Sequence, residues 1–176
     1  MMKGFEDRFQ PVEGLGRIRQ IGGSVDGSDL KIGICTSRYN RPLTEGLVRS
    51  TVEALLERAV PMNCITVVWV PGAYEIPSAI EVMAESGDYD AFIALAAIIW
   101  GETAHAELIA GEVTRGLGEI SRRHRVPVID GVVTAYTEGQ ARARCLSGRS
   151  SRGWYAAAAA VEMGTLVRKI TAMQPG

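Results

Sequence analysis

Short apolar runs alternate along this chain with longer segments in which apolar side chains recur every three or four positions. The runs are Lys31–Thr36, Ile65–Val70, Ala91–Ile99 and Val126–Thr134, and their length predicts buried β-strands. The longer segments have the spacing of amphipathic helices. Strands that alternate with helices predict an α/β domain with a parallel sheet covered on both faces.

Five segments show an apolar stripe or a start signal of a helix. The first stripe, between the first two strands, comprises Val48, Val52, Leu55, Leu56 and Ala59, and a later one comprises Ala106, Ile109, Ala110, Val113, Leu117 and Ile120. The other helices are expected at Glu75–Glu85, after the capping-box pattern of Thr137 and Gln140, and at Ala156–Ile170. Right-handed crossovers then predict a three-layer α/β/α sandwich of flavodoxin-like type with a central four-stranded parallel sheet.

Composition places this domain after an N-terminal extension. Residues 1–29 are rich in glycine and charge, so the domain is predicted to span residues 30–176. The chain is 47% apolar with a formal net charge of −1, which suggests neither a nucleic-acid nor a membrane partner. Its three cysteines lack CxxC spacing, so we expect no disulfide framework and no metal site, and a cytoplasmic location is the simplest.

Polar and glycine-rich segments follow the predicted strands, where ligands of open α/β sheets bind. One of them, Gly101-Glu102-Thr103-Ala104-His105, begins a long helix, and the N–H groups at a helix N-terminus suit a phosphate. His105, expected one turn inside the helix, could move protons near neutral pH. The alternative is a glycine turn with a threonine cap and a solvated histidine, because such short motifs are weak signals alone.

Two further loops carry candidate binding groups. Pro71–Pro77 contains Gly72, Ala73, Tyr74 and Glu75. It could hydrogen-bond a flat heterocycle or a polyol with Glu75 as an acceptor, or be a rigid loop with a buried tyrosine.

The loop Ser37–Asn40 offers Tyr39 for stacking on a planar ring and Asn40 for a hydrogen bond to it. An ordinary loop aromatic fits this local pattern equally well.

Basic residues gather in the last third of the chain. Arg142, Arg144, Arg149 and Arg152 suit bidentate phosphate binding, although a charge run alone favours a solvated face. His124, which stands among arginines, is expected on the surface, and Cys35 is expected in the core.

Taken in order, these motifs resemble the 6,7-dimethyl-8-ribityllumazine synthase family over about residues 30–170. The family pattern R-F-N is matched by residues 38–40, V-P-G-A-F-E-I-P by 70–77 and G-x-T-x-H by 101–105. The family motif G-V-L-T is echoed by residues 131–134 and E-Q-A by residues 139–141. The arginine that follows is Arg144, and K-G-W-E-A-A is echoed by residues 152–157.

The resemblance implies an enzyme of riboflavin biosynthesis that needs no metal or organic cofactor. Such an enzyme condenses 5-amino-6-(D-ribitylamino)uracil with 3,4-dihydroxy-2-butanone 4-phosphate. It implies that His105 shuttles protons and that the substrates contact Tyr39, Asn40, Gly72, Ala73, Tyr74, Glu75, Ile99, Gly101, Glu102, Thr103, Asp130, Arg144 and Arg152. It also implies a homo-pentamer with active sites between adjacent subunits. Such pentamers can occur alone, as a decamer or in a 60-subunit capsid. An N-terminal strand of a neighbouring subunit could extend the central sheet.

The sequence departs from the family pattern near the implied site. Asp130 stands where a phenylalanine usually covers the substrate ring, and Trp100 where a basic or polar residue is common. Ala106 replaces an aromatic residue, Leu146 a glycine and Arg152 a lysine. These differences keep a second hypothesis open, in which the chain is a non-catalytic flavin- or lumazine-binding or cage-forming protein on the same fold.

Overall fold

A four-stranded parallel sheet forms the centre of the computed structural model, which describes residues 9–173. Its strands are β1 (Ile32–Ser37), β2 (Ile65–Val70), β3 (Ala91–Leu95) and β5 (Val128–Asp130), in the order β2-β1-β3-β5. β1 lies in the middle and pairs with β2 from Ile32↔Ile65 to Ser37↔Val70. The predicted four-stranded parallel sheet is confirmed.

Two strands predicted as continuous are each divided. The run 91–99 forms β3 and β4 (Ala97–Ile99), and the run 126–134 forms β5 and β6 (Val133–Ala135). β4 and β6 make a separate parallel pair, although main-chain bonds from Gly131 N to Ala94 O and from Val133 N to Ala96 O, both 2.8 Å, bridge the interruption. A Cβ at Gly131 would lie 2.8 Å from Ala94 O, so the strands approach too closely here for a larger residue.

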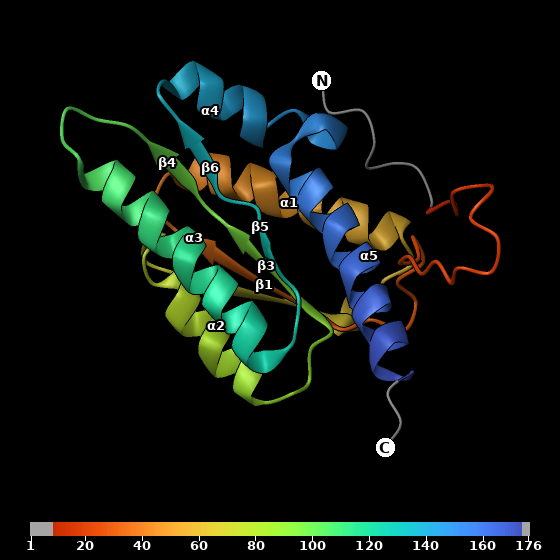
Figure 1. Ribbon diagram of the computed structural model, residues 1–176. Coiled ribbons are helices and arrows are strands. Elements are labelled where there is room, and N and C mark those ends of the chain that lie inside the picture. Colours follow the sequence, from red (N-terminus) through yellow and green to blue (C-terminus); the bar gives the residue numbers. More distant parts are fainter. Residues whose placement is uncertain (1–8, 174–176) are drawn as a thin grey trace.

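Helices cover both faces of the sheet, as predicted (Figure 1). α1 (Arg41–Glu57) and α5 (Arg152–Thr171) pack on one face, and α2 (Ile76–Glu85) and α3 (His105–His124) pack on the other. The short α4 (Glu138–Cys145) lies beside β4 and β6. Single 3-10 turns occupy Met62–Cys64 and Gly148–Ser150.

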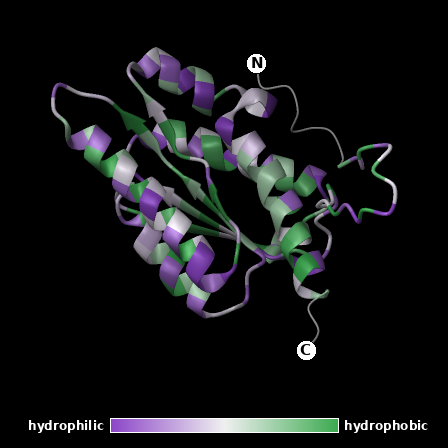
Figure 2. Cartoon of the chain, in the orientation of Figure 1, coloured by the Kyte–Doolittle hydropathy of each residue, from purple (hydrophilic) through white to green (hydrophobic). Residues whose placement is uncertain are grey.

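The apolar core consists of two clusters, one on each face of the sheet. Successive residues of β3 alternate between them: Ile93 and Leu95 join the cluster under α1 and α5, and Phe92 and Ala94 join the one under α2 and α3. This alternation follows from the two-residue period of a strand. Figure 2 shows the hydrophobic strands at the centre and hydrophilic positions on the outer surfaces of the helices.

Capping residues set the starts of the last two helices. Thr137 accepts a hydrogen bond at Oγ1 from Gln140 N (3.2 Å), which confirms the predicted start of α4. α5 begins at Arg152 rather than at Ala156, because Ser151 Oγ accepts from Trp154 N (3.2 Å) and so provides an earlier N-cap. The predicted α1 stripe ran too far, since Ala59 lies beyond the helix with φ 62°.

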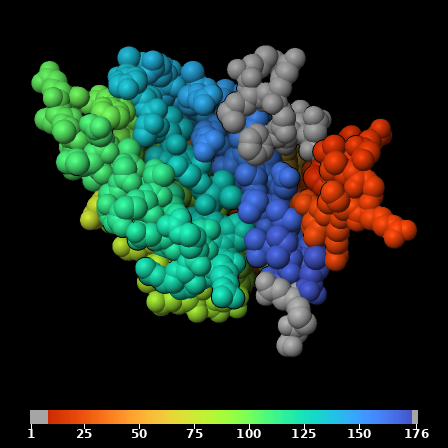
Figure 3. Space-filling view, in the orientation of Figure 1, coloured from red at the N-terminus to blue at the C-terminus, as the bar shows by residue number. Residues whose placement is uncertain are grey.

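The N-terminal segment contains neither a helix nor a strand from residue 9 to residue 31, and part of it is bonded to α5. Ser24 N donates to Thr165 Oγ1 (2.7 Å), and Lys169 Nζ donates to Gly22 O (2.9 Å). Figure 3 shows the residues after position 8 as a projection beside α5. Within residues 9–173 no helix has the length and hydrophobicity needed to cross a membrane.

Candidate functional site

A pocket of about 620 Å³ opens at the carboxyl ends of the strands. Ten of the candidate residues predicted from the sequence line this pocket: Tyr39, Asn40, Gly72, Ala73, Tyr74, Glu75, Ile99, Gly101, Thr103 and His105. These residues come from three segments that are far apart in sequence, each including a loop that follows a strand. They meet because parallel strands bring their carboxyl ends to one edge of the sheet.

The loop after β1 supplies one wall of the pocket. Tyr39 is 73% exposed, so its ring is available to a ligand. Asn40 has left-handed backbone angles, φ 56° and ψ 42°, and is the residue that precedes α1. Its side-chain Nδ2 donates a hydrogen bond to Ala97 O (2.8 Å).

The loop after β2 is closed by its own glutamate. Glu75 Oε2 accepts a hydrogen bond from Gly72 N (2.9 Å), and Ile76 N donates to Ala73 O (3.1 Å). Tyr74 is 54% exposed, so the alternative of a rigid loop with a buried tyrosine is wrong. The second carboxylate oxygen of Glu75 has no hydrogen bond among the described residues and can accept one from a ligand hydroxyl.

The third part of the pocket is the start of α3. The helix begins at His105 itself, with Ala104 as the N-cap, so the prediction that His105 lies one turn inside is wrong. The first main-chain bond of the helix runs from Leu108 N to Ala104 O (3.1 Å). The main-chain N–H groups before Leu108 therefore have no acceptor within the helix. They lie at the positive end of the helix dipole and can bind an anion. A Cβ placed on Gly101 would meet no atom within 4 Å, so its backbone is open to a ligand.

Four candidate residues do not line this pocket: Glu102, Asp130, Arg144 and Arg152. Glu102 is exposed in the loop before α3, and Arg144 is exposed on α4. Asp130 ends β5, where its Oδ1 accepts from Val132 N (2.9 Å) and its carbonyl oxygen accepts from the Arg152 guanidinium. No arginine or lysine lies among the residues that line the pocket.

Sequence reasoning missed five residues that line the pocket. They are Ser37, Ala97, Ile98, Ala106 and Ile109. Ala97 and Ile98 stand near the end of an apolar run and Ile109 on the apolar stripe of α3, which is the pattern of core residues, while Ala106 stands near the implied site only as a departure from the family pattern. The nearby Trp100 instead packs against Tyr136, with ring centroids 5.4 Å apart.

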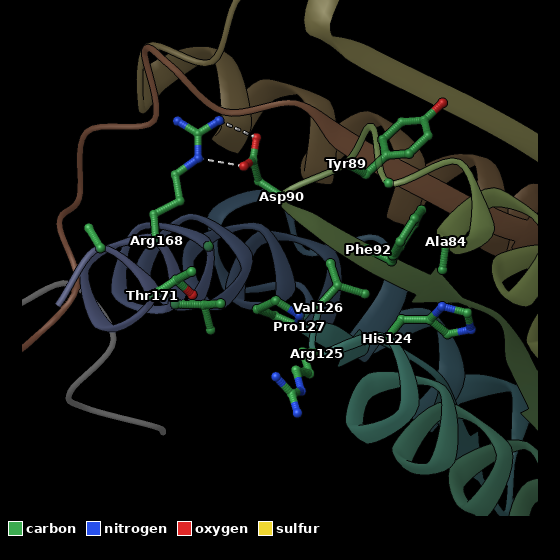
Figure 4. Close-up of a pocket in the computed structure, with 14 residues that line it drawn as sticks. Ala84, Tyr89, Asp90, Phe92, His124, Arg125, Val126, Pro127, Arg168 and Thr171 are labelled. Atoms are coloured by element: carbon green, nitrogen blue, oxygen red, sulfur yellow. Dashed lines mark hydrogen bonds and ion pairs between the residues drawn. The ribbon is translucent and has the colours of Figure 1, made fainter. Parts of the chain in front are cut away.

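A second hollow of about 410 Å³ lies at the opposite end of the sheet, between the start of β3 and the last turn of α5. Two of its charged groups are paired with each other: Arg168 Nη2 donates to Asp90 Oδ2 (2.8 Å), as Figure 4 shows. His124, on its rim, is only partly exposed, and its Nε2 lies 2.7 Å from Glu81 Oε1. The predicted surface histidine is thus half-buried and paired rather than fully solvated, because α2 brings a carboxylate to the end of α3.

The cysteines stand apart from the pocket chemistry. All three are free thiols, and Cys35 is fully buried in β1, as predicted. Burial raises the pKa of the Cys35 thiol to about 12 and that of Cys145 to about 11. Both are therefore protonated and unreactive at neutral pH.

The fold and the pocket define a flavodoxin-like α/β protein that can bind a planar ring, a polar chain and an anion at the carboxyl edge of its sheet. Comparison with known proteins identifies its family. The family model for 6,7-dimethyl-8-ribityllumazine synthase matches residues 29–168. The chain thus belongs to the 6,7-dimethyl-8-ribityllumazine synthase family.

Two relatives carry the same name. The 6,7-dimethyl-8-ribityllumazine synthase of Nitrosospira multiformis is 38% identical over 157 residues, covering 89% of this chain and 96% of the relative. That of Nitrosomonas europaea is 40% identical over 156 residues, covering 89% and 93%. The similarity therefore extends over almost the whole length of both relatives.

Proposed function

We propose that this transferase of riboflavin biosynthesis condenses 5-amino-6-(D-ribitylamino)uracil with 3,4-dihydroxy-2-butanone 4-phosphate to form 6,7-dimethyl-8-ribityllumazine, with release of water and inorganic phosphate. One observation carries the proposal: a single pocket joins an exposed aromatic ring, a loop of hydrogen-bonding groups and a helix N-terminus that begins with a histidine. Each part has the chemistry of one portion of the two substrates.

The pyrimidine would lie between Tyr39 and the free edge of β4. Val133 N donates to Ala96 O and Trp100 N donates to Ala135 O, so even-numbered residues of this segment face β6. In a parallel ladder alternate residues face opposite neighbours, and the main-chain groups of Ile99 therefore face away from β6. Together with the Tyr39 ring they offer hydrogen bonds and a stacking surface to a uracil.

The ribityl chain would run along the loop 72–75. Its hydroxyls can donate to the Glu75 oxygen that Gly72 N does not use. Main-chain groups of the loop add further donors and acceptors, which suits a flexible polyol.

The phosphate of the butanone would bind at the N-terminus of α3, with Gly101 allowing close approach and Thr103 adding a hydroxyl. His105, exposed at the first position of that helix, is then adjacent to the phosphate and to the reacting carbons. It would transfer protons while the amine of the uracil forms an imine with the ketone and while phosphate leaves. Holding both substrates in register supplies a large part of the rate.

We further propose that the site is completed by a second copy of the chain in a homo-pentamer. A phosphate needs cationic partners, and no arginine or lysine of residues 9–173 in the same chain lines the pocket. Arg144 and Arg152, with Asp130, would reach the pocket of a neighbouring subunit. Sedimentation velocity of the purified protein separates a pentamer from a decamer or a 60-subunit capsid, and a monomer would contradict a shared site. The free thiols fit a reducing cytoplasm.

The enzymatic proposal is tested by mixing the purified protein with both substrates and following the fluorescence of the lumazine product. Product should form well above the spontaneous rate of the same mixture without protein. A rate equal to the spontaneous one, with the ribityl substrate still bound, would instead support the non-catalytic ligand-binding alternative, which no observation at present favours.

A further inference from the structure

Asn40 connects two parts of the pocket that are distant in sequence. Its backbone takes the left-handed conformation at φ 56°, between Tyr39 and the first residue of α1. Its carbonyl oxygen accepts from Leu43 N (2.9 Å), which starts the helix. Its side-chain Nδ2 donates to Ala97 O (2.8 Å), 57 positions away.

Among residues 9–173, β4 has a strand neighbour on one side only, so the Ala97 carbonyl is available to another partner. β4 pairs with β6, while β1 ends at Ser37 after pairing with β3 as far as Thr36↔Leu95. The ladder with β6 uses Ala96 O and Trp100 N, so the carbonyl of Ala97 faces the open side. The Asn40 amide takes the place of the missing strand at that carbonyl.

We propose that Asn40 is a positioning residue of the site, which fixes the Tyr39 loop against the open edge of β4. This inference rests on the proposed function, because Tyr39 and Ile99 are the two surfaces between which the pyrimidine would bind. The bond from Asn40 to Ala97 sets the separation of these surfaces before the substrate arrives. Since its Nδ2 is bonded to Ala97, Asn40 acts mainly through the position of Tyr39.

Asparagine meets two requirements at this position. It tolerates left-handed backbone angles better than other non-glycine residues, and its amide donates to a carbonyl. Aspartate keeps the shape but cannot donate when ionised, and glycine keeps the backbone conformation but has no side chain. The two substitutions therefore remove the bond without imposing backbone strain.

The test compares Asn40→Asp and Asn40→Gly with the wild-type protein and with Ser121→Ala. Ser121 Oγ donates to Val126 O (2.9 Å) at the other end of the sheet, so its variant loses a similar bond away from the pocket. Both Asn40 variants should raise the KM for the ribitylaminouracil about tenfold, the effect of losing one partly buried hydrogen bond. The KM for the butanone phosphate should change less than about twofold, and Ser121→Ala should change neither.

A pH series separates positioning from direct contact with substrate. In Asn40→Asp, a protonated carboxyl can again donate to Ala97 O, so the affinity for an unreactive ribitylaminouracil without its 5-amino group should recover toward wild type as the pH falls. Hydrogen exchange of residues 39–44 in the ligand-free variant should be faster than in wild type at neutral pH and should slow on acidification.

Unchanged exchange and an unchanged KM in both Asn40 variants would overturn the positioning role. A wild-type protein that forms no product would refute the proposed function instead, and the exchange measurement would still decide the role of Asn40.

Discussion

The Arg152 guanidinium donates a hydrogen bond to the main-chain carbonyl of Asp130, so the last residue of β5 is held by the first turn of α5. The Asp130 carboxylate is turned to its own backbone, where Oδ1 accepts from Val132 N (2.9 Å). The position at which the family usually has a phenylalanine is therefore occupied by an ordered polar group. If Asp130 faces a neighbouring pocket, as proposed, the substrate ring lacks one stacking surface.

Restoring the aromatic side chain should strengthen binding of the pyrimidine. We expect Asp130→Phe to lower the KM for the ribitylaminouracil about fivefold, because an aromatic contact contributes about 0.5–1.5 kcal/mol beyond its buried area. Asp130→Asn, which can still accept from Val132 N, is the matched control and should give no gain. Steady-state kinetics with the butanone phosphate saturating measure this, and an equal KM in all three proteins would refute the proposed position of Asp130.

Arg144 should act on the phosphate substrate. Arg144→Ala is expected to raise the KM for the butanone phosphate about tenfold or more, since a charge-assisted hydrogen bond contributes about 1.5–3 kcal/mol. Arg142→Ala removes a neighbouring arginine of α4 that lies 3.7 Å from Glu138, and it should leave this KM unchanged. If Arg142→Ala raises this KM as much as Arg144→Ala does, the effect is a general loss of positive charge and the specific role of Arg144 in phosphate binding is refuted.

His105 should contribute to turnover more than to binding. We expect His105→Ala to slow single turnovers by roughly 10²-fold, the lower end of general acid–base contributions. The dissociation constant of the ribityl substrate should change less than about threefold, because the imidazole lies at the phosphate end of the pocket. Rapid-mixing fluorescence measures both quantities, and equal single-turnover rates in the two proteins would exclude the proton shuttle.

Gly153 should be sensitive to the smallest substitution because α1 and α5 meet there. A Cβ at this position would lie 2.5 Å from Leu47 O and 2.7 Å from Ser50 Oγ. Gly153→Ala is expected to lower the free energy of unfolding by about 2 kcal/mol, in the range of overpacked cores.

The control for this prediction is Gly111→Ala in α3, where an added Cβ meets no atom within 4 Å. That variant should be as stable as wild type or more stable by up to about 1 kcal/mol, because alanine favours a helix. Urea unfolding at one protein concentration compares them, and equal losses in both variants would contradict the packing argument.

The contact between Glu81 and His124 should make stability depend on pH. The hydrogen bond from His124, assisted by Arg123, holds the pKa of the Glu81 carboxyl below its ordinary value of 4.5. A carboxyl whose pKa is lower in the folded than in the unfolded protein stabilises the folded state. This stabilisation is complete at pH values above the pKa of the unfolded state, and it is lost as the pH falls through the pKa of the folded state.

Wild type should therefore exceed Glu81→Gln in unfolding free energy by up to about 1 kcal/mol at pH 6. The difference should shrink as the pH falls below about 4.5, the ordinary pKa of the group. Denaturant unfolding at several pH values measures it, and a difference that is independent of pH would show that the ion pair is not its source.

The elements of this fold could be predicted from the sequence because each depends on local periodicity. The run Ile65–Val70 forms the strand that its apolar pattern predicts, and Thr137 with Gln140 caps α4 as their spacing requires. Motif order likewise indicated the family, because each motif is a contiguous stretch of chain.

Other features depend on residues that only the tertiary structure brings together. The division of 91–99 into β3 and β4 follows from strand neighbours, and the bond of Asn40 to Ala97 joins positions 57 apart. His124 is partly buried because a helix 43 positions away supplies Glu81.

The sequence by itself thus determined the order and type of the main elements, the parallel sheet and the family, but not where each strand and helix begins and ends. The tertiary structure decided which candidate residues share a pocket, separating Tyr39 and His105 from Arg144 and Arg152. The physical reason is that periodicity is encoded along the chain, whereas convergence at the edge of a sheet depends on how the crossovers place each loop in space.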